Sequence, residues 1–296
     1  MSRTHRNTIF IEDARILDHQ ALDGDQQVLR VAAPKLAASA TPGCFAHVQC
    51  DPTLAMRRPM SVMRVNPTAG WAEFLYKKVG KGTRLLAQKQ VGDILSVLGP
   101  IGQGFTPDAD RPRALLIGGG VGIPPMVFLA DQLRHDKRYS PLVLMGSEVP
   151  FPFPVRPSQI LVPGMPDGAI ACMPLIEDWG LASRLSSLQG YAGCHDGYVT
   201  DLARAWLDTL DKESRAQVAV YACGPTPMLK AVADLAQQYD LPCQVCLEEF
   251  MACAVGGCAG CAVRVYDDDA GEAMKRVCVD GPVFAAEKVL WNAIPA

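Results

Sequence analysis

Four cysteines near the C-terminus constrain this chain more than any other feature, because their spacing requires a tight loop around a metal centre. They are Cys253, Cys258, Cys261 and Cys278, in the pattern C-x4-C-x2-C-x16-C. The first three match the run that holds a plant-type [2Fe–2S] cluster, whose fourth ligand follows later in the chain. Alanine and glycine fill most of the loop, so the backbone has room to approach inorganic sulfide, and glycine supplies positive φ angles. The spacing therefore predicts a one-electron iron–sulfur centre.

Two other interpretations of these cysteines stay open. A zinc site also uses four thiolates, but its usual pattern is two C-x2-C pairs, and within this set only Cys258 and Cys261 have that spacing. Structural thiols or disulfides are the other interpretation. Residues 1–8 are not followed by the apolar core and cleavage site of a signal peptide, so we expect a cytoplasmic protein, in which disulfides are rare.

The bulk properties exclude some classes of function. A length of 296 residues allows two or three domains, and 49% hydrophobic with 20% charged residues is typical of a globular protein. The net charge of −3 gives no reason to expect a nucleic acid or an anionic membrane as partner. The uncharged stretch 114–130 contains four glycines and two prolines, which indicates a strand, a turn and a helix start rather than a membrane span.

The N-terminal part, up to about residue 108, has the pattern of β-structure. Short apolar or alternating runs are separated by Gly, Pro, Asn and Asp, which predicts a small antiparallel barrel or sandwich. One helix, Arg84–Lys89, is expected behind the glycines at 80 and 82, with Thr83 as its N-cap. The expected strands are Val28–Ala32, Phe45–Cys50, Ser61–Val65, Trp71–Lys77 and Ile94–Leu98.

From about residue 111 strands alternate with helices, which predicts a parallel sheet covered on both faces. The strand Arg113–Ile117 leads through the turn Gly118–Gly122 into a helix that ends near Asp136 and has two prolines in its first turn. Further strands are expected at Leu142–Met145 and Gln217–Ala222. The expected fold class is multi-domain α+β: an antiparallel barrel, a parallel-sheet α/β domain and a small C-terminal cluster domain.

The helix after residue 224 has clear signals at its start. Thr226 can cap it with Pro227 at the first helical position, and apolar residues then recur at helical spacing. The apolar face consists of Met228, Leu229, Val232, Leu235 and Ala236. The stretch 150–174 is rich in proline and is expected to be an insertion or a long loop.

Glycine-rich turns supply candidate phosphate sites. The turn Gly118–Gly122, between a strand and a helix, offers unpaired N–H groups and a positive helix end, although a close helix–strand contact would use the same residues. Gly82 and Thr83 form a second candidate of this kind. Arg58 can pair with a phosphate and Ser61 can hydrogen-bond the polar edge of a ring, whereas an Arg-Pro pair in a loop is usually a solvated turn.

The other seven of the eleven cysteines are interpreted differently. Cys243 and Cys246 imitate a C-x2-C pair, but residues at this spacing on a strand point to opposite faces and do not share a metal. We expect them to be buried apolar residues, like Cys44, Cys50, Cys172 and Cys194. Cys223 ends a strand, where α/β proteins have their sites.

Six segments, taken in order, resemble one family. They are Arg58–Ser61 (RPMS), Leu75–Thr83 (LYKKVGKGT), Leu98–Phe105 (LGPIGQGF), Gly118–Pro125 (GGGVGIPP), Cys223–Met228 (CGPTPM) and the cysteine block ending in Val277–Phe284 (VCVDGPVF). Together they resemble the electron transfer subunit of dihydroorotate dehydrogenase B, a branch of the ferredoxin–NADP reductase superfamily. The resemblance covers nearly the whole chain, and the cysteine block is its most specific part.

The resemblance implies an FAD-binding barrel over 1–108, an NAD(P)-binding α/β domain over 109–245 and a [2Fe–2S] domain over 246–296. The implied FAD contacts are Arg58, Pro59, Met60, Ser61, Leu75, Tyr76, Lys77, Gly82 and Thr83. The candidate pyridine-nucleotide contacts are Gly118, Gly119, Gly120, Gly122, Cys223, Gly224 and Pro225. The implied cluster ligands are Cys253, Cys258, Cys261 and Cys278. In the family the subunit pairs with an FMN-containing catalytic subunit that oxidises dihydroorotate in pyrimidine biosynthesis, and electrons pass to NAD⁺.

The electron count supports such an assembly. A nicotinamide exchanges two electrons at once and an iron–sulfur cluster takes one, so a flavin, which handles both steps, must lie between them. No catalytic acid, base or nucleophile is needed on this chain, and we expect the substrate chemistry on a partner chain. Two alternatives remain: the same cofactors serving a different dehydrogenase, and a zinc-stabilised interaction module without redox activity.

Two segments depart from the family pattern. Lys77 stands where the family has arginine, and lysine does not form a bidentate contact. Residues 174–187 replace a compact Asp-Gly-Ser segment near the pyridine nucleotide, which leaves the choice between NAD and NADP open. Arg184 in this segment is interpreted as a solvated helix residue, with a contact to a 2′-phosphate as the alternative.

Overall fold

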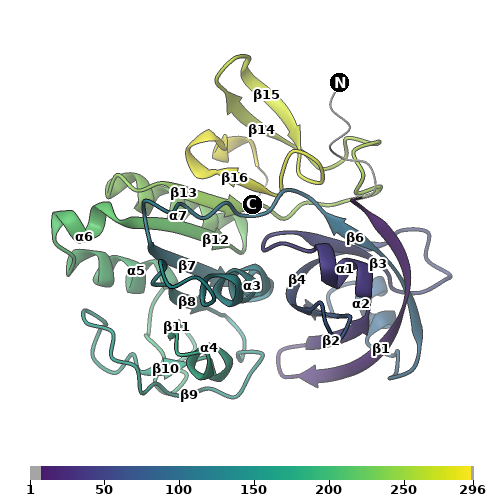
Figure 1. Ribbon diagram of the computed structural model, residues 1–296, viewed down its shortest axis with the longest axis horizontal. Helices are drawn as coiled ribbons and strands as arrows, with labels where there is room; N and C mark the ends of the chain where they lie inside the picture. Colours follow the sequence, from purple (N-terminus) through teal and green to yellow (C-terminus); the bar gives the residue numbers. More distant parts are fainter. Residues whose placement is uncertain (1–7, 295–296) are drawn as a thin grey trace.

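The computed structural model describes residues 8–294 and arranges them in three parts. In Figure 1 an N-terminal barrel and an α/β domain lie side by side, and a C-terminal hairpin stands above the region where they meet. The expected multi-domain α+β fold class is confirmed.

The barrel is closed and antiparallel, with the strand order β1-β2-β5-β4-β3-β6. Apolar residues such as Ile16, Val31 and Phe74 fill its interior, because side chains alternate between the two faces of each strand. The sequence does not predict β1, since polar side chains interrupt its apolar alternation. The elements are β1 (Phe10–Leu22), β2 (Gln26–Ala32), α1 (Pro34–Ser39), β3 (Phe45–Gln49), β4 (Arg58–Asn66), β5 (Trp71–Lys77), α2 (Lys81–Leu86) and β6 (Ile94–Ile101).

Helix α2 begins earlier than the sequence predicts. Gly80, in an extended conformation, precedes it, and Thr83 lies inside its first turn. The Thr83 hydroxyl accepts hydrogen bonds from the backbone N–H groups of Val79 and Gly80, at 3.1 and 3.3 Å. The prediction of Thr83 as N-cap is therefore wrong, because its side chain reaches back to the helix start from within the helix.

The α/β domain is built on a six-stranded sheet in the order β11-β8-β7-β12-β13-β16. The first five strands pair in parallel, as predicted, and β16 adds to β13 in the antiparallel direction. Helix α3 covers one face, and α5 and α7 cover the other. The elements are β7 (Arg113–Gly119), the 3₁₀ turn η1 (Gly120–Gly122), α3 (Ile123–Leu133), β8 (Leu142–Gly146), α4 (Pro174–Asp178), β11 (Ala182–Ser186), α5 (Val199–Asp208), α6 (Lys212–Ala216), β12 (Val218–Cys223), α7 (Thr226–Gln238), β13 (Cys243–Cys246) and β16 (Val283–Ala285).

The carboxyl ends of these strands face the barrel. After β8, the carbonyl of Pro150 accepts a hydrogen bond from the Gln26 side chain at 2.7 Å. At the end of β13, Cys246 Sγ lies 3.8 Å from the carbonyl oxygen of Gly43. Sites in α/β sheets lie at the carboxyl edge, so the two domains enclose the expected position of a ligand.

Helix boundaries differ from the predictions by a few residues. Helix α3 ends at Leu133 instead of Asp136. Helix α7 begins at Thr226, and Pro225, still extended, is its N-cap. The predicted N-cap, Thr226, and the predicted first helical residue, Pro227, therefore each lie one position too far along the chain. The predicted apolar face is confirmed: Leu229, Val232, Leu235 and Ala236 are buried, and Met228 is partly buried against the same core.

The proline-rich stretch 150–174 is an ordered excursion from the sheet that includes a small two-stranded ribbon. Its strands are β9 (Arg156–Pro157) and β10 (Ala171–Cys172). Arg184 fastens the excursion to β11, because its guanidinium donates to the carbonyls of Ser183 and Ile160, each at 2.7 Å. Arg184 is only 5% exposed and belongs to a strand. Both predictions for Arg184, a solvated helix residue and a 2′-phosphate contact, are therefore wrong.

The C-terminal segment adds a hairpin and short helical turns to the α/β domain. They are β14 (Ala262–Asp267), β15 (Gly271–Arg276), η2 (Ala286–Lys288) and η3 (Trp291–Ala293). Buried residues of this segment, such as Val265 and Val277, belong to the same core as residues of α5 and α7. Within residues 8–294 no helix has the length and apolar character to cross a membrane, and the uncharged stretch 114–130 forms β7, the glycine turn and most of α3.

Candidate functional site

Two glycine turns meet at the carboxyl edge of the central strands. The turn Gly118–Gly122 follows β7, and the turn Cys223–Pro225 follows β12, its neighbour in the sheet. A Cβ on Gly122 would lie 2.4 Å from backbone atoms of both Cys223 and Gly224, so only glycine lets these backbones touch. The first turn also leads directly into helix α3, and the start of a helix at this edge suits the phosphates of a nucleotide.

Met228 packs against both turns from the start of α7. A Cβ on Gly119 would lie 2.4 Å from its Sδ, and a Cβ on Gly224 would lie 2.5 Å from its Cε. The structure thus brings together all seven predicted nucleotide contacts: Gly118, Gly119, Gly120, Gly122, Cys223, Gly224 and Pro225.

The loops at this carboxyl edge carry acidic side chains and one histidine, His195, but no lysine or arginine. The loops span residues 119–123, 147–155, 187–198, 224–226 and 247–260, all within the described part of the chain. Glu148, Asp196, Glu248 and Glu249 lie in them, and neither Lys nor Arg does. Any anionic ligand at this edge would therefore depend on backbone N–H groups, on His195 or on cations from other elements.

Cys223 is buried and its thiol faces a neighbouring thiol. A hydrogen bond with the Cys246 side chain, together with burial, raises the pKa of Cys223 well above its ordinary value. Cys243 and Cys246 pack into cores on opposite faces of the sheet, which confirms that they do not share a metal. Cys44, Cys50 and Cys172 are buried as predicted, whereas Cys194 is half-buried.

On the barrel, Arg58 lies against the first turn of α2. A Cβ on Gly82 would be 3.0 Å from Arg58 Nε, so the two groups are in close contact. The Nη1 atom of Arg58 donates to the carbonyls of Met56 and Arg57 at 2.9 and 3.0 Å, which fixes the guanidinium in place. A fixed guanidinium beside a glycine fits the pyrophosphate of a dinucleotide.

The other predicted FAD residues divide into two groups. Leu75 packs into the core shared with α3, so it lies on the side of the barrel that faces the α/β domain. Met60 and Tyr76 point into the barrel core and are 5% and 4% exposed, so mainly their backbone is available to a ligand. Arg58, Pro59, Ser61 and Lys77 are partly exposed, and Gly82 and Thr83 are buried.

The cysteine loop wraps tightly, as its composition predicts. Gly256 has a φ of 80°, and two alanines, Ala254 and Ala259, also have positive φ angles of 56° and 53°. The N–H group of Gly260 donates to Cys258 Sγ at 3.4 Å. The left-handed conformation costs roughly 1–2 kcal/mol for a residue with a side chain, so the rest of the loop holds the two alanines in it. The small residues thus let the backbone approach a cluster closely, but glycine supplies only one of these three positions with positive φ.

Side-chain contacts link Cys253 to Cys258 and Cys261 to Cys278, and Cys278 also lies close enough to Cys253 for their charges to interact. Burial opposes ionisation of Cys253, but backbone N–H groups and the Cys258 side chain lower its pKa to about 7. Burial and the contact with Cys261 raise the pKa of Cys278 to about 12.

Two pairs of thiols suit a binuclear [2Fe–2S] cluster, whose two irons share four protein ligands. A structural zinc ion holds all four of its ligands around one point. Cys258 is exposed, whereas Cys261 and Cys278 are buried, so one edge of the loop faces solvent.

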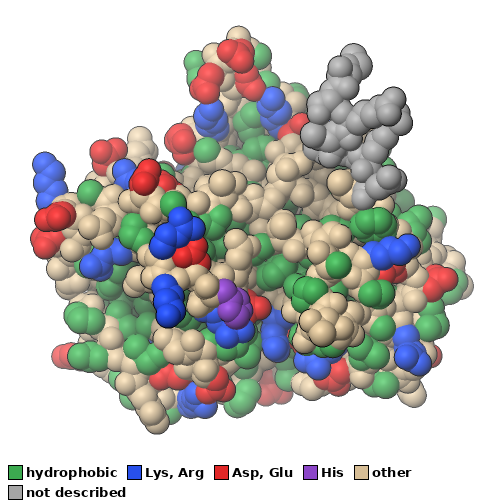
Figure 2. Space-filling view, in the orientation of Figure 1, with side chains coloured by type: hydrophobic (Ala, Val, Ile, Leu, Met, Phe, Trp, Pro, Cys, Tyr) green, Lys and Arg blue, Asp and Glu red, His purple; other side chains and the backbone are tan. Residues whose placement is uncertain are grey.

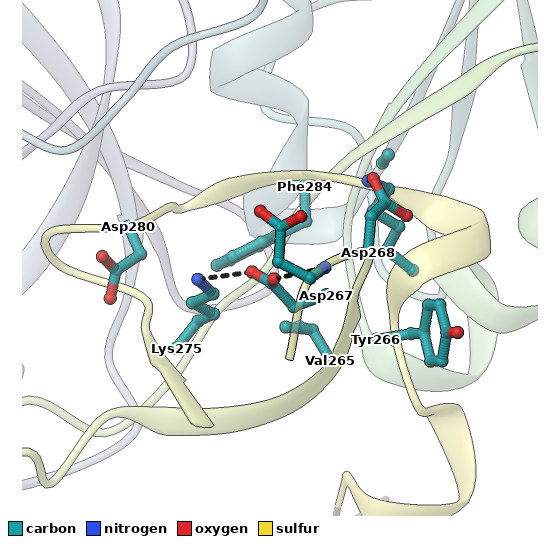
Figure 3. Close-up of a pocket in the computed structure, with 10 residues that line it drawn as sticks. Val265, Tyr266, Asp267, Asp268, Lys275, Asp280 and Phe284 are labelled. Carbon is teal, nitrogen blue, oxygen red and sulfur yellow. Dashed lines mark hydrogen bonds and ion pairs between the residues drawn. The ribbon is translucent and has the colours of Figure 1, made fainter. Parts of the chain in front are cut away.

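A hollow of about 390 Å³ lies on the β14–β15 hairpin (Figure 3). Asp267, Asp268 and Asp280 line it together with Lys275 and Lys288. Lys275 Nζ lies 2.8 Å from Asp267, and Lys288 Nζ lies 2.5 Å from Asp268. Figure 2 shows acidic side chains gathered at the tip of this hairpin. Because lysines already pair with two of the carboxylates, we assign no ligand to the hollow.

The sequence analysis missed Glu248, which follows β13. Its side chain is exposed, yet the surrounding protein desolvates the carboxyl group and raises its pKa to about 7. No motif marks the residue, because its environment is assembled from distant parts of the chain.

The fold and the cysteine loop together define a ferredoxin reductase-like protein with an iron–sulfur segment. A solved structure of the NADH-dependent reduced ferredoxin–NADP oxidoreductase is similar with a TM-score of 0.77 and 25% identity, covering 95% of this chain and 91% of that chain. The ferredoxin reductase of carbazole 1,9a-dioxygenase shares the fold, with a TM-score of 0.60 and 22% identity over 79% of this chain and 67% of that chain.

Sequence comparison identifies the particular family. A family model described as the iron–sulfur cluster binding domain of dihydroorotate dehydrogenase B matches residues 248–290. The dihydroorotate dehydrogenase B (NAD(+)) electron transfer subunit of Desulforamulus reducens is 32% identical over 95% of this chain and 98% of its own length. The subunit of the same name from Bacillus caldolyticus is 38% identical over 84% of this chain and 86% of its own length. The chain belongs to the family of dihydroorotate dehydrogenase B electron transfer subunits, which confirms the resemblance found in the sequence.

Proposed function

We propose that this chain carries electrons between a pyridine nucleotide and a partner flavoprotein dehydrogenase through FAD and a [2Fe–2S] cluster. The partner is the FMN-containing dihydroorotate dehydrogenase subunit of pyrimidine biosynthesis, in a hetero-oligomer with this chain. The observation that carries the proposal is the cysteine loop, matched over residues 248–290 by a cluster-binding family model, joined to a ferredoxin reductase-like fold. Related subunits that match most of the chain are named electron transfer subunits of dihydroorotate dehydrogenase B (NAD(+)).

Each cofactor has a matching part of the chain. Arg58 and Gly82 hold the pyrophosphate of FAD, and Ser61 bonds the ring edge, from the domain 1–108. The two glycine turns of the domain 109–245 hold the pyridine nucleotide. The segment 246–296 would hold the cluster through its four cysteines.

When bound, FAD converts the two-electron exchange of the nicotinamide into the one-electron exchange of the cluster. The residues of the chain hold these groups in line. The carboxyl edge of the sheet faces the barrel, and β13 runs from that edge directly into the cysteine loop. From Cys246 to Cys253 the chain spans at most about 25 Å even when fully extended, which keeps the cluster beside the nucleotide edge.

NAD is the preferred nucleotide in this proposal. A 2′-phosphate is usually held by Arg or Lys, and the loops at the carboxyl edge contain neither. Arg184, the one basic residue of the altered segment 174–187, is buried and occupied by backbone carbonyls. The segment 174–187, which replaces the Asp-Gly-Ser segment of the family, therefore adds no site for the 2′-phosphate of NADP.

Electrons leave from the exposed edge of the cysteine loop. Cys258 is exposed there, Phe250 is 93% exposed and Val255 is 51% exposed. The run 250–263 contains no charged residue. An uncharged surface with an unpacked aromatic side chain is typical of the centre of a protein–protein interface. The catalytic subunit therefore docks over this loop.

The proposal includes a cytoplasmic location. Its support is that none of the eleven cysteines forms a disulfide, as expected in a reducing compartment.

An anaerobic visible spectrum before and after addition of NADH tests the proposal. Flavin bands and broad iron–sulfur absorption should both bleach, and NADPH should act far more slowly. Cys261→Ala should remove the iron–sulfur absorption and spare the flavin bands, while Cys243→Ala, a buried cysteine outside the loop, should keep both. A colourless protein that contains zinc would contradict the proposal, and colour that NADH fails to bleach would contradict the assigned nucleotide site.

A further inference from the structure

Arg276 lies among the segments that carry the cluster cysteines. It ends β15, two residues before Cys278, and pairs with Ala262, which directly follows Cys261. The N–H of the next residue, Val277, donates to the carbonyl of Cys261 at 3.0 Å. The backbone of Arg276 is therefore fixed between two of the four ligand positions.

The side chain of Arg276 reaches the loop between the other two cysteines, Cys253 and Cys258. Its Nη1 atom donates to the carbonyl oxygen of Gly256 at 3.0 Å. A Cβ on Gly256 would lie 2.6 Å from Cγ2 of Val279 and 3.2 Å from Nη1 of Arg276, and the φ of Gly256 is 80°. Only glycine suits this position, where the turn that follows β15 packs against the loop.

The peptide group between Gly256 and Gly257 joins this contact to a cluster ligand. Its carbonyl accepts from Arg276, and its N–H, on Gly257, is directed at the sulfur of Cys253. The N–H of Gly256 is directed at Cys278. A charged donor on a carbonyl polarises the whole amide, so the N–H on the other side of the same peptide becomes a stronger donor. The guanidinium therefore acts on the Cys253 sulfur through one peptide group.

A carboxylate holds the guanidinium in this position. Asp280 Oδ2 accepts the backbone N–H of Arg276 at 2.7 Å and lies 3.5 Å from its Nε. The Arg276 carbonyl in turn accepts from the N–H groups of Val279 and Asp280 at 3.0 and 2.8 Å. Asp280 and solvent both screen the charge of Arg276, whose side chain is 41% exposed. The direct contact with Gly256 is therefore a stronger influence on the cluster than the long-range field.

We propose that Arg276 raises the reduction potential of the [2Fe–2S] cluster by strengthening the hydrogen bond from the Gly257 N–H to the Cys253 sulfur. The proposal rests on the proposed function, because it requires a cluster on the four cysteines. The reduced cluster carries one more negative charge than the oxidised cluster, and hydrogen bonds to its sulfurs stabilise that charge. Arg276 is a positioning residue, since it acts through the peptide. With Arg276 in place, the cluster accepts an electron from the flavin more readily.

The midpoint potential of the cluster in the full chain, from a redox titration followed by EPR, tests this. Arg276→Met removes the donor and should lower the equilibrium constant for reduction about tenfold. For a one-electron couple that is a shift of about 59 mV to lower potential. Arg276→Lys keeps a charged donor and should recover most of the shift. The matched control Lys275→Gln removes the charge next to it, on a side chain paired with Asp267 (Figure 3), and should leave the potential unchanged.

Two results would overturn the proposal directly. One is an equal potential for the wild type and Arg276→Met. The other is an equal shift in Arg276→Met and Lys275→Gln, because the effect would then be one of charge alone. If Arg276→Met assembles no cluster, Arg276→Gln, a neutral donor, takes its place and should also have a lowered potential.

Iron and sulfide analysis separates tuning from assembly. A folded Arg276→Gln chain without a cluster would overturn the proposal, because Arg276 would then be needed to build the loop rather than to tune it. A wild-type chain that holds no [2Fe–2S] cluster would instead refute the proposed function.

Discussion

Gly122→Ala is the most direct test of how the two glycine turns build the nucleotide site. The φ of Gly122 is −84°, a conformation open to any residue, so the substitution acts through space alone. The new Cβ would lie 2.4 Å from the backbone of Cys223 and Gly224, which is about 1 Å closer than ordinary contact, and backbone atoms yield far less easily than a side-chain end. Overpacking of this kind costs about 1–3 kcal/mol. A melting temperature lower by about 2–10 °C follows.

The functional loss should exceed the stability loss. Displacing the turns by about 1 Å misplaces the nucleotide and should slow the reduction of FAD by NADH by roughly 100-fold. The matched control is Gly120→Ala, because Gly120 has a φ of 54° but open space around its Cβ position. That variant should lose only about 1 kcal/mol of conformational energy. Stopped-flow reduction and thermal melting measure both quantities, and equal behaviour of the two variants would refute the steric argument.

Three further predictions concern other parts of the molecule. His47 is buried, and desolvation, followed by the charge of Arg57, lowers its pKa from 6.5 to about 4. The free energy of unfolding should therefore fall by roughly 3 kcal/mol as the pH drops from above 6.5 through 4. Urea titrations should not find this loss in His47→Leu. Arg184→Leu should free the excursion 150–174 and speed its proteolysis, since the carbonyls of Ser183 and Ile160 lose their donor; unchanged cleavage would count against the anchor. Phe250→Asp should weaken binding of the catalytic subunit about 30-fold in a titration and leave reduction by NADH unchanged, whereas Leu161→Asp, also on a highly exposed apolar residue, should affect neither.

Local spacing in the sequence was sufficient to predict the metal loop and most of the sheet. The positions of Cys253 to Cys278 alone require a wrapped loop, and its small residues agree with that loop. Strands Trp71–Lys77 and Arg113–Ile117 were also predictable, because runs of apolar residues bounded by turn formers leave few other conformations. These features depend on neighbours in the chain.

The misplaced features depend on distant parts of the chain. Thr83 has the composition of an N-cap, but Gly80 takes the extended conformation first and the hydroxyl reaches back from inside the helix. Arg184 looks like a surface residue until the excursion 150–174 covers it. Glu248 has an ordinary sequence context, and only desolvation by the folded protein, which raises its pKa, distinguishes it.

Strand β16 has a consequence for the assembly of the protein. It pairs with β13 and forms the last strand of the large sheet, yet it follows all four cluster cysteines in the chain. During synthesis on the ribosome, the sheet therefore remains open at β13 until the cysteine loop has emerged, and an open edge is prone to wrong pairing. A chain truncated before the loop would keep that edge of β13 exposed, so the reductase part of this protein should be prone to wrong pairing when it is made without its C-terminal segment.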